Sequence, residues 1–322
     1  MTLLNSPVVA HSRSHLMKLI SDAIATQGSD VDLNFIDVSG VNNMRQLFAD
    51  TPFVGDISQW DTSNVQSMAG MFKSCAFNGD ISRWNVSQVQ NMNAMFMDAN
   101  HSGDLSRWDT SSVTNMAGTF SKNRGSPDIH SWNVSRVYRM DSMFSESDFN
   151  GDVSKWDTSQ VTTLNYMFYS SKFNGDVSRW NVSNVDDMSN MFCKSPFNQD
   201  VSQWDVRKVE RFSAMFRDSA FIGDISIWKF HLDMDFFEMF SSDMLSSITQ
   251  PNLYHWSAVL NNAGVHPLLD TNAAWQEHFT QCYPVLNGLG LESNQCARDL
   301  QTLWLMKTNQ PHQTLALPEM EN

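Results

Sequence analysis

Three residues near the end of the sequence have side chains that commonly take part in catalysis or metal binding. His278 and Cys282 are four residues apart in a stretch with helical periodicity, and Cys296 follows. Imidazole and thiolate groups ligate metal ions, and a thiol can act as a nucleophile. The three residues lack the paired spacing of a metal motif, and the sequence has no glycine-rich phosphate loop, serine elbow or zinc motif. We therefore predict a protein that is not an enzyme and has no cofactor.

A calcium site is a second candidate, because aspartate recurs every 24 residues after a turn-like segment. These aspartates are Asp56, Asp80, Asp104, Asp128, Asp152, Asp176, Asp200 and Asp224. Stacked turns can present several oxygens to a hard cation, with Asp80, Asp104, Asp152 and Asp176 as ligands. The alternative is that each carboxylate caps backbone amides of its own turn. We favour the alternative, because the nine-residue glycine pattern of calcium-binding solenoids is absent.

The aspartates belong to a repeat that must position them. Tryptophan and phenylalanine each recur at intervals of 24 residues without an insertion or deletion. The tryptophans are Trp60, Trp84, Trp108, Trp132, Trp156, Trp180, Trp204 and Trp228, and the phenylalanines run from Phe48 to Phe240. Constant length and phase allow each coil to stack on the previous one, so the sequence predicts a solenoid.

Each 24-residue coil contains two kinds of pattern. Val89, Met92, Met95 and Phe96 have the spacing of one face of a short helix. The segment 80–87 has the β-branched and aromatic residues of a strand that follows a turn. The predicted fold class is therefore an α/β repeat solenoid, leucine-rich-repeat-like, with about nine strand-helix coils and a parallel sheet on one face. A bend is expected between Ile81 and Trp84 if both face the core.

The two ends of the chain lack the repeat and are expected to act as caps. Residues 1–30 contain one apolar helical stripe, between Ser14 and Gly28. Residues 31–250 are the predicted solenoid. Residues 251–322 have three helical patterns, which indicate a helical C-terminal cap or small domain.

Composition narrows the class of protein. The chain has 322 residues with 41% apolar residues, which excludes a disordered polymer, and its net charge of −14 disfavours nucleic-acid and anionic-membrane binding. No stretch has the apolar length of a secretory signal or a membrane span. We expect a cytoplasmic protein, or one exported without a cleaved signal peptide. Cys75 and Cys193 lie in distant coils, out of disulfide reach.

A row of mostly polar residues directly precedes the tryptophans. It contains Gln59, Arg83, Arg107, Ser131, Lys155, Arg179 and Gln203. Such a row lies where a solenoid presents a concave binding surface, and arginine suits an acidic protein partner. The alternative is a solvated face that supports solubility. We take Gln59, Arg83, Arg107, Lys155, Arg179 and Gln203 as candidate partner-binding residues.

The residues after the tryptophans alternate between aspartate and asparagine, and the next position alternates between threonine and valine. The first set is Asp61, Asn85, Asp109, Asn133, Asp157, Asn181 and Asp205. Carboxylates about 4.8 Å apart would repel by roughly 3.5 kcal/mol at an effective dielectric of about 20, and an interposed amide doubles their spacing. We interpret both alternations as structural and as the product of a duplicated two-coil unit. Asn85-Val86-Ser87 also fits an N-glycosylation pattern, which the repeat itself explains.

One coil departs from the pattern. His101 and Ser102 replace Phe-Asn, Thr119 replaces methionine, and the segment 121–128 has no aromatic residue where one is due. We predict that lost packing makes this the softest part of the array.

The complete unit, F-N-x-D-[IV]-S-x-W-[DN]-[TV]-S-x-V-x-x-M-x-x-M-F, closely resembles the repeat of the BspA-like leucine-rich-repeat surface proteins, also found in mycoplasma lipoproteins. The resemblance covers about Asp32 to Phe240. It implies a bacterial, non-enzymatic scaffold that binds a protein partner. The alternative is a bacterial effector exported without a cleaved signal, whose repeats recognise a host protein while the C-terminal helices carry a separate activity. Residues from Pro251 onward match nothing in this family.

Overall fold

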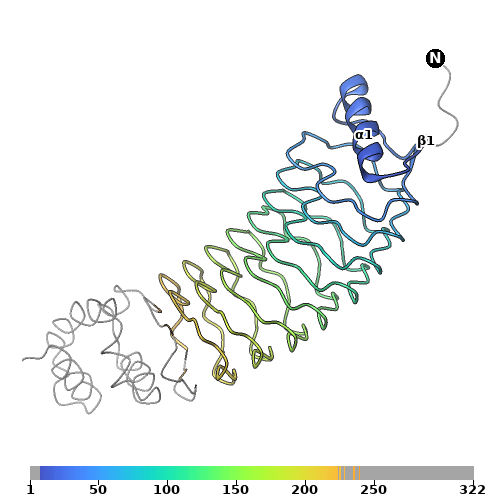
Figure 1. Ribbon diagram of the computed structural model, residues 1–322. Helices are drawn as coiled ribbons and strands as arrows, with labels where there is room; N and C mark the ends of the chain where they lie inside the picture. Colours follow the sequence, from blue (N-terminus) through green and yellow to red (C-terminus); the bar gives the residue numbers. More distant parts are fainter. Residues whose placement is uncertain (1–7, 224, 226–227, 229–234, 236–238, 240–322) are drawn as a thin grey trace, which may run out of the picture.

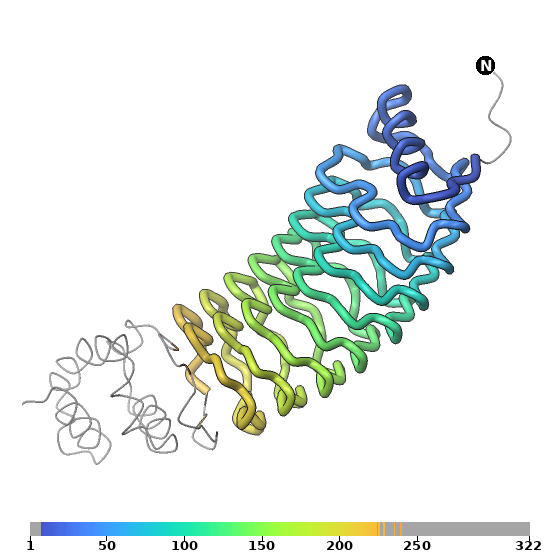
Figure 2. Tube along the Cα trace, in the orientation of Figure 1, coloured from blue at the N-terminus to red at the C-terminus, as the bar shows by residue number. Residues whose placement is uncertain are grey.

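Each 24-residue repeat of the sequence forms one coil of the structure. The computed structural model describes residues 8–223, 225, 228, 235 and 239. In this part the chain winds as a stack of coils that follow one another along one axis (Figures 1 and 2). Parallel bridges join equivalent residues of successive coils, from Asn43 with Ser67 to Arg211 with Asp235. Side chains at one repeat position therefore form a column along the stack.

The N-terminal end of the stack is covered by one helix and a short strand (Figure 1). The helix α1 (Arg13–Gln27) lies where the sequence predicts a helix, and it buries Leu16, Ile20 and Ala23. The hydroxyl of Ser12 accepts the N–H of His15 at its start, and Gly28 ends it at a φ of 98°. Strand β1 (Val8–Val9) pairs in parallel with β2 (Ile36–Asp37).

The short helix predicted in every coil is wrong for the described residues, among which α1 is the one α-helix. In its place is a run of tight turns, in which the N–H of Met95 donates to the carbonyl of Met92 at 3.1 Å and that of Met97 to Ala94 at 3.2 Å. Ala94 and Asp98 both have a φ of 54°, in the left-handed region that a right-handed helix cannot contain. The same two positions have positive φ in the neighbouring coils.

The turns free every second N–H to bind the next coil. Met92, Ala94 and Phe96 donate to Asn115, Ala117 and Thr119 at 3.0, 2.8 and 2.8 Å. The intervening N–H groups close turns within their own coil, so the buried backbone groups of this segment are satisfied. We call this segment of each coil, equivalent to residues 90–98, the ladder. The ladder supplies the backbone hydrogen bonds between coils, which the sequence assigned to the predicted strand at 80–87.

The predicted strand at 80–87 is wrong for the same coils, because that segment turns twice. Trp84 donates its N–H to Ile81 at 3.1 Å, and Val89 donates to Val86 at 2.9 Å. The first turn is the expected bend that allows both Ile81 and Trp84 to be buried. Here the coils are joined by side chains, since the indole N–H of Trp84 donates to the carbonyl of Ile57 at 3.1 Å.

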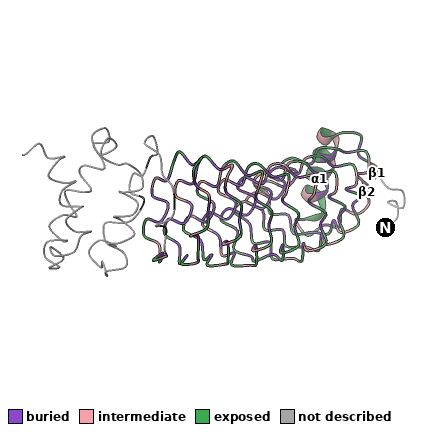
Figure 3. Cartoon of the chain, turned by 90° about the horizontal axis from the view of Figure 1, so that it is seen from below, coloured by how far each residue is buried: buried purple, intermediate pink, exposed green. Residues whose placement is uncertain are grey.

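Aromatic columns fill the interior, and the outer surface carries the exposed residues (Figure 3). Trp60 stacks on Trp84 with ring centroids 6.4 Å apart, and Phe72 stacks on Phe96 at 5.6 Å. Backbone pairing keeps neighbouring coils about 4.8 Å apart at the ladder.

Several predictions lie outside this description. The C-terminal helices at 251–322 fall beyond the described residues, and the domain boundaries stay predictions. Assignment to the leucine-rich-repeat class also stays a prediction. The described coils contain neither the helix nor the strand that the sequence predicts for each coil. In the described part, no helix combines the length and apolar character needed to cross a bilayer.

Candidate binding surface

The predicted binding row lies on the tryptophan side of the stack. Each of its residues ends the first turn of a coil, directly before a buried tryptophan, and is exposed. The exposed members include the candidates Gln59, Arg83, Arg107, Lys155, Arg179 and Gln203. Among the described residues, none of its four cations forms an ion pair within 4.0 Å. The row lies on a run of turns, whereas the sequence placed it on a parallel sheet.

Aspartates flank this row on one side and cap their own turns. The carboxylate of Asp80 accepts the N–H of Ser82 at 2.9 Å, and Asp104 and Asp152 accept equivalent bonds. Hydrogen bonds from Ser82 lower the pKa of Asp80, and the charge of Arg83 lowers it further. In the described chain no group of three or more His, Cys, Asp or Glu side chains could hold a metal ion. The calcium alternative with Asp176 as a fourth ligand therefore gains no support.

Alternating residues flank the row on the other side. Asp61 and Asn85 each accept the N–H of the serine two residues later, at 3.0 and 3.1 Å. The hydroxyl of Thr62 reaches the next coil and donates to the carbonyl of Asn85 at 2.9 Å. Both alternating columns thus hold the backbone, as the sequence indicates. The cations of the row lie between two stripes that carry carboxylates.

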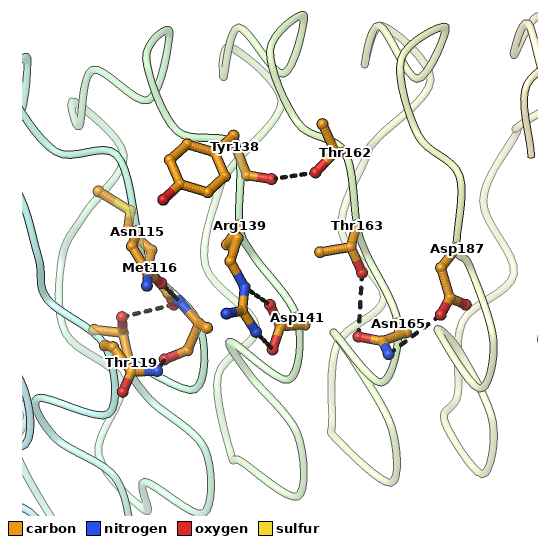
Figure 4. Close-up of polar contacts among 12 residues, drawn as sticks. Asn115, Met116, Thr119, Tyr138, Arg139, Asp141, Thr162, Thr163, Asn165 and Asp187 are labelled. Carbon is orange, nitrogen blue, oxygen red and sulfur yellow. Dashed lines mark hydrogen bonds and ion pairs between the residues drawn. The ribbon is translucent and has the colours of Figure 1, made fainter.

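The ladder face carries a second group of residues that the sequence did not single out. On the coil of Trp132, Arg139 donates Nε and Nη2 hydrogen bonds to Asp141 at 2.9 and 3.0 Å (Figure 4). The bonds to Asp141 raise the pKa of Arg139. Tyr138 is next to it and receives a hydrogen bond from the Thr162 hydroxyl on its carbonyl oxygen, at 3.1 Å. In Figure 4 the Thr162–Tyr138 bond joins two successive coils, whereas the Arg139–Asp141 pair lies within one coil.

Tyrosines continue this group on the next coil. Tyr166 and Tyr169 lie with ring centroids 5.4 Å apart, and the amino group of Lys194 lies 6.0 Å from the Tyr169 ring. The column of Tyr166 carries smaller side chains in preceding coils, for example Ala94 and Gly118. The sequence signal that could have found the tyrosines is their appearance in columns that hold no aromatic residue in the preceding coils.

His278, Cys282 and Cys296 lie outside the described residues. Cys75 and Cys193 are both buried and no disulfide joins them, as the sequence predicts. Burial raises the pKa of the Cys75 thiol, which makes it a poor nucleophile.

Comparison with protein families gives a match over most of the chain. The family described as "Mycoplasma protein of unknown function, DUF285" matches residues 16–126, 101–196 and 147–256. The comparison with curated proteins gave no match, and neither did the comparison with solved structures. The three overlapping matches cover the same stretch as the 24-residue repeat. The chain therefore belongs to the DUF285 family of Mycoplasma-type repeat proteins.

Proposed function

We propose that the chain is a non-enzymatic scaffold that binds a protein partner through exposed rows on a repeat solenoid. The observation that carries the proposal is the row of Arg83, Arg107, Lys155 and Arg179, exposed on a backbone that is fixed by hydrogen bonds. These cations do not form ion pairs in the described part of the chain, so their donors are available to another molecule.

The fixed backbone also favours binding. Arg83, Arg107 and Arg179 each end a turn whose tryptophan is buried and bonded to the preceding coil, as Trp108 is to Ile81 at 3.0 Å. The backbone of such a surface is already ordered, so it loses little conformational entropy when a partner binds, and this favours affinity. The resemblance of the repeat to BspA-like proteins, which implies protein binding, supports the same proposal.

Site-specific photocrosslinking tests the proposal. A photoreactive amino acid at Gln59, at the edge of the row, should capture a discrete partner from an extract of the source organism. Capture should be lost in an Arg83→Glu, Arg107→Glu variant and retained in Lys18→Glu, Lys73→Glu, which changes the net charge equally elsewhere. Equal capture by both variants, or no discrete partner, would contradict the proposal.

A further inference from the structure

Two exposed tyrosines on the ladder face contribute little to the fold. The side chains of Tyr138 and Tyr166 are 46% and 40% exposed, among the few large apolar side chains that the described surface leaves in solvent. Tyr166 also has a φ of 57°, a conformation that is unfavourable for a residue with a bulky side chain. Gly70 and Gly118 occupy the same column with a φ of 63°. A tyrosine there costs about 1–2 kcal/mol of backbone strain that glycine avoids.

Two ion pairs on the ladder face have the cation more exposed than the carboxylate. Asp141 is 20% exposed, whereas the Arg139 guanidinium that it holds is 48% exposed. The next pair repeats this asymmetry, with Asp187 at 12% and Arg211 at 49%. The carboxylates therefore lie low against the backbone and the guanidinium groups face the solvent. On a chain with a net charge of −14, this region presents positive groups beside phenol rings.

The geometry leaves binding capacity on Arg139. Asp141 takes its Nε and one Nη2 hydrogen bond, so both hydrogens of Nη1 remain to bind another acceptor. The bidentate pair also fixes the plane of the guanidinium, which lowers the entropy lost on binding. Lys194 adds a second cation beside Tyr169. Tyrosine and arginine are the residue types most enriched in protein-binding hot spots.

We infer that Tyr138, Arg139, Tyr166, Tyr169 and Lys194, here called the tyrosine patch, bind an acidic segment of a partner protein. Carboxylates of the segment pair with Arg139 and Lys194, and its apolar side chains pack on the tyrosine rings. The exposed acids Asp186 and Glu210, beside Arg211, mark where the patch ends. The inference rests on the proposed scaffold function but uses a different face from the row at Arg83.

A displayed library of random twelve-residue peptides, selected on the full chain, tests the patch. Enriched peptides should be rich in Asp and Glu with aromatic residues. Their dissociation constants, measured by fluorescence anisotropy, should rise at least about tenfold in Tyr138→Thr, Arg139→Thr, Tyr166→Ala. Each replacement is a residue that another coil carries in the same column, as in Thr162, Thr163 and Ala94. If the triple variant is destabilised, Tyr138→Thr alone should still weaken binding about threefold.

The matched control is Arg83→Gln, Arg107→Gln, on the tryptophan side, and it should leave peptide affinity unchanged. If the control loses the peptides and the triple variant keeps them, the tyrosine patch is excluded while the scaffold function stands. Enrichment of neutral or basic peptides, or of none, also overturns the inference. A twenty-nucleotide oligothymidine that binds the wild type and not the triple variant would mark a nucleic-acid site instead.

Discussion

The hydroxyl of Thr110 donates a hydrogen bond to the carbonyl oxygen of Asn133 in the next coil, at 2.9 Å. Thr62 and Thr158 make the equivalent bond to their next coils, and valine occupies the column in the coils between. The tryptophans stack in the same coil pairs, as Trp108 does on Trp132 at 6.1 Å. The two-coil unit of the sequence is therefore also a unit of packing. A threonine joins the two coils in the first three units, whereas the unit of Trp204 and Trp228 has Val206 in that column.

Replacing this buried hydroxyl should destabilise the stack. Thr110→Val removes the donor and leaves the Asn133 carbonyl without a partner, so we expect the free energy of unfolding to fall by about 1–3 kcal/mol. Urea denaturation measures the change. Thr114→Val is the matched control, because the Thr114 hydroxyl makes an exposed bond to Gln90 that water can replace. If both variants lowered the free energy of unfolding equally, burial would not explain the contribution of the Thr110 hydrogen bond to stability.

The left-handed positions of the ladder predict opposite effects for glycine and alanine. Ala94→Gly should raise the free energy of unfolding by about 1 kcal/mol, because glycine adopts its φ of 54° without strain. Gly118→Ala, at a φ of 63°, should lower it by about 1–2 kcal/mol. Ala117→Gly, outside the left-handed positions, serves as the control and should destabilise. Destabilisation by Ala94→Gly would argue against this ladder geometry.

His101 should make the stack sensitive to acid. Its ring is fully buried on Phe96, with neither nitrogen hydrogen-bonded, and burial lowers its pKa from 6.5 to about 4. Between these values the unfolded chain binds the proton more readily. Stability should therefore fall by up to about 3 kcal/mol as the pH drops from about 6.5 to about 4.

His101→Phe restores the aromatic column and should remove this slope. It also eliminates two buried nitrogens without partners, so the variant should be about 1–3 kcal/mol more stable at neutral pH. Urea denaturation across the pH range compares the variant with wild type and with His11→Gln, which replaces an exposed histidine. A slope that persists in His101→Phe would assign the acid sensitivity to other groups.

Ion pairs should stabilise the irregular coil against the next one. Asp148 lies 3.5 Å from Arg124 and 3.1 Å from Lys172, and thus joins three successive coils. Because both cations are exposed, Asp148→Asn should cost only about 0.5–1 kcal/mol at low salt. The difference from wild type should shrink in 1 M NaCl, where the screening length is about 3 Å. A loss that does not depend on salt would point to a packing role for Asp148.

The sequence by itself determined the length of each coil and the residues that face inward. An interval of 24 residues without an insertion allows stacking at one phase only, so the aromatic columns followed from residue type and spacing. Burial of Trp84, Met92 and Phe96 agrees with that expectation. The turn-capping role of the aspartates could also be inferred, because Asp and Asn bind backbone groups two residues on.

Only the tertiary structure decided how the backbone runs between those columns. The spacing of Val89, Met92, Met95 and Phe96 suits one face of a helix and also a run of turns. The choice depends on whether alternate N–H groups bind within the coil or reach the carbonyls of the next coil, as Met92 does to Asn115. The tyrosine patch was likewise hidden, because Tyr138 and Tyr166 belong to successive coils and are brought onto one face only when the coils stack.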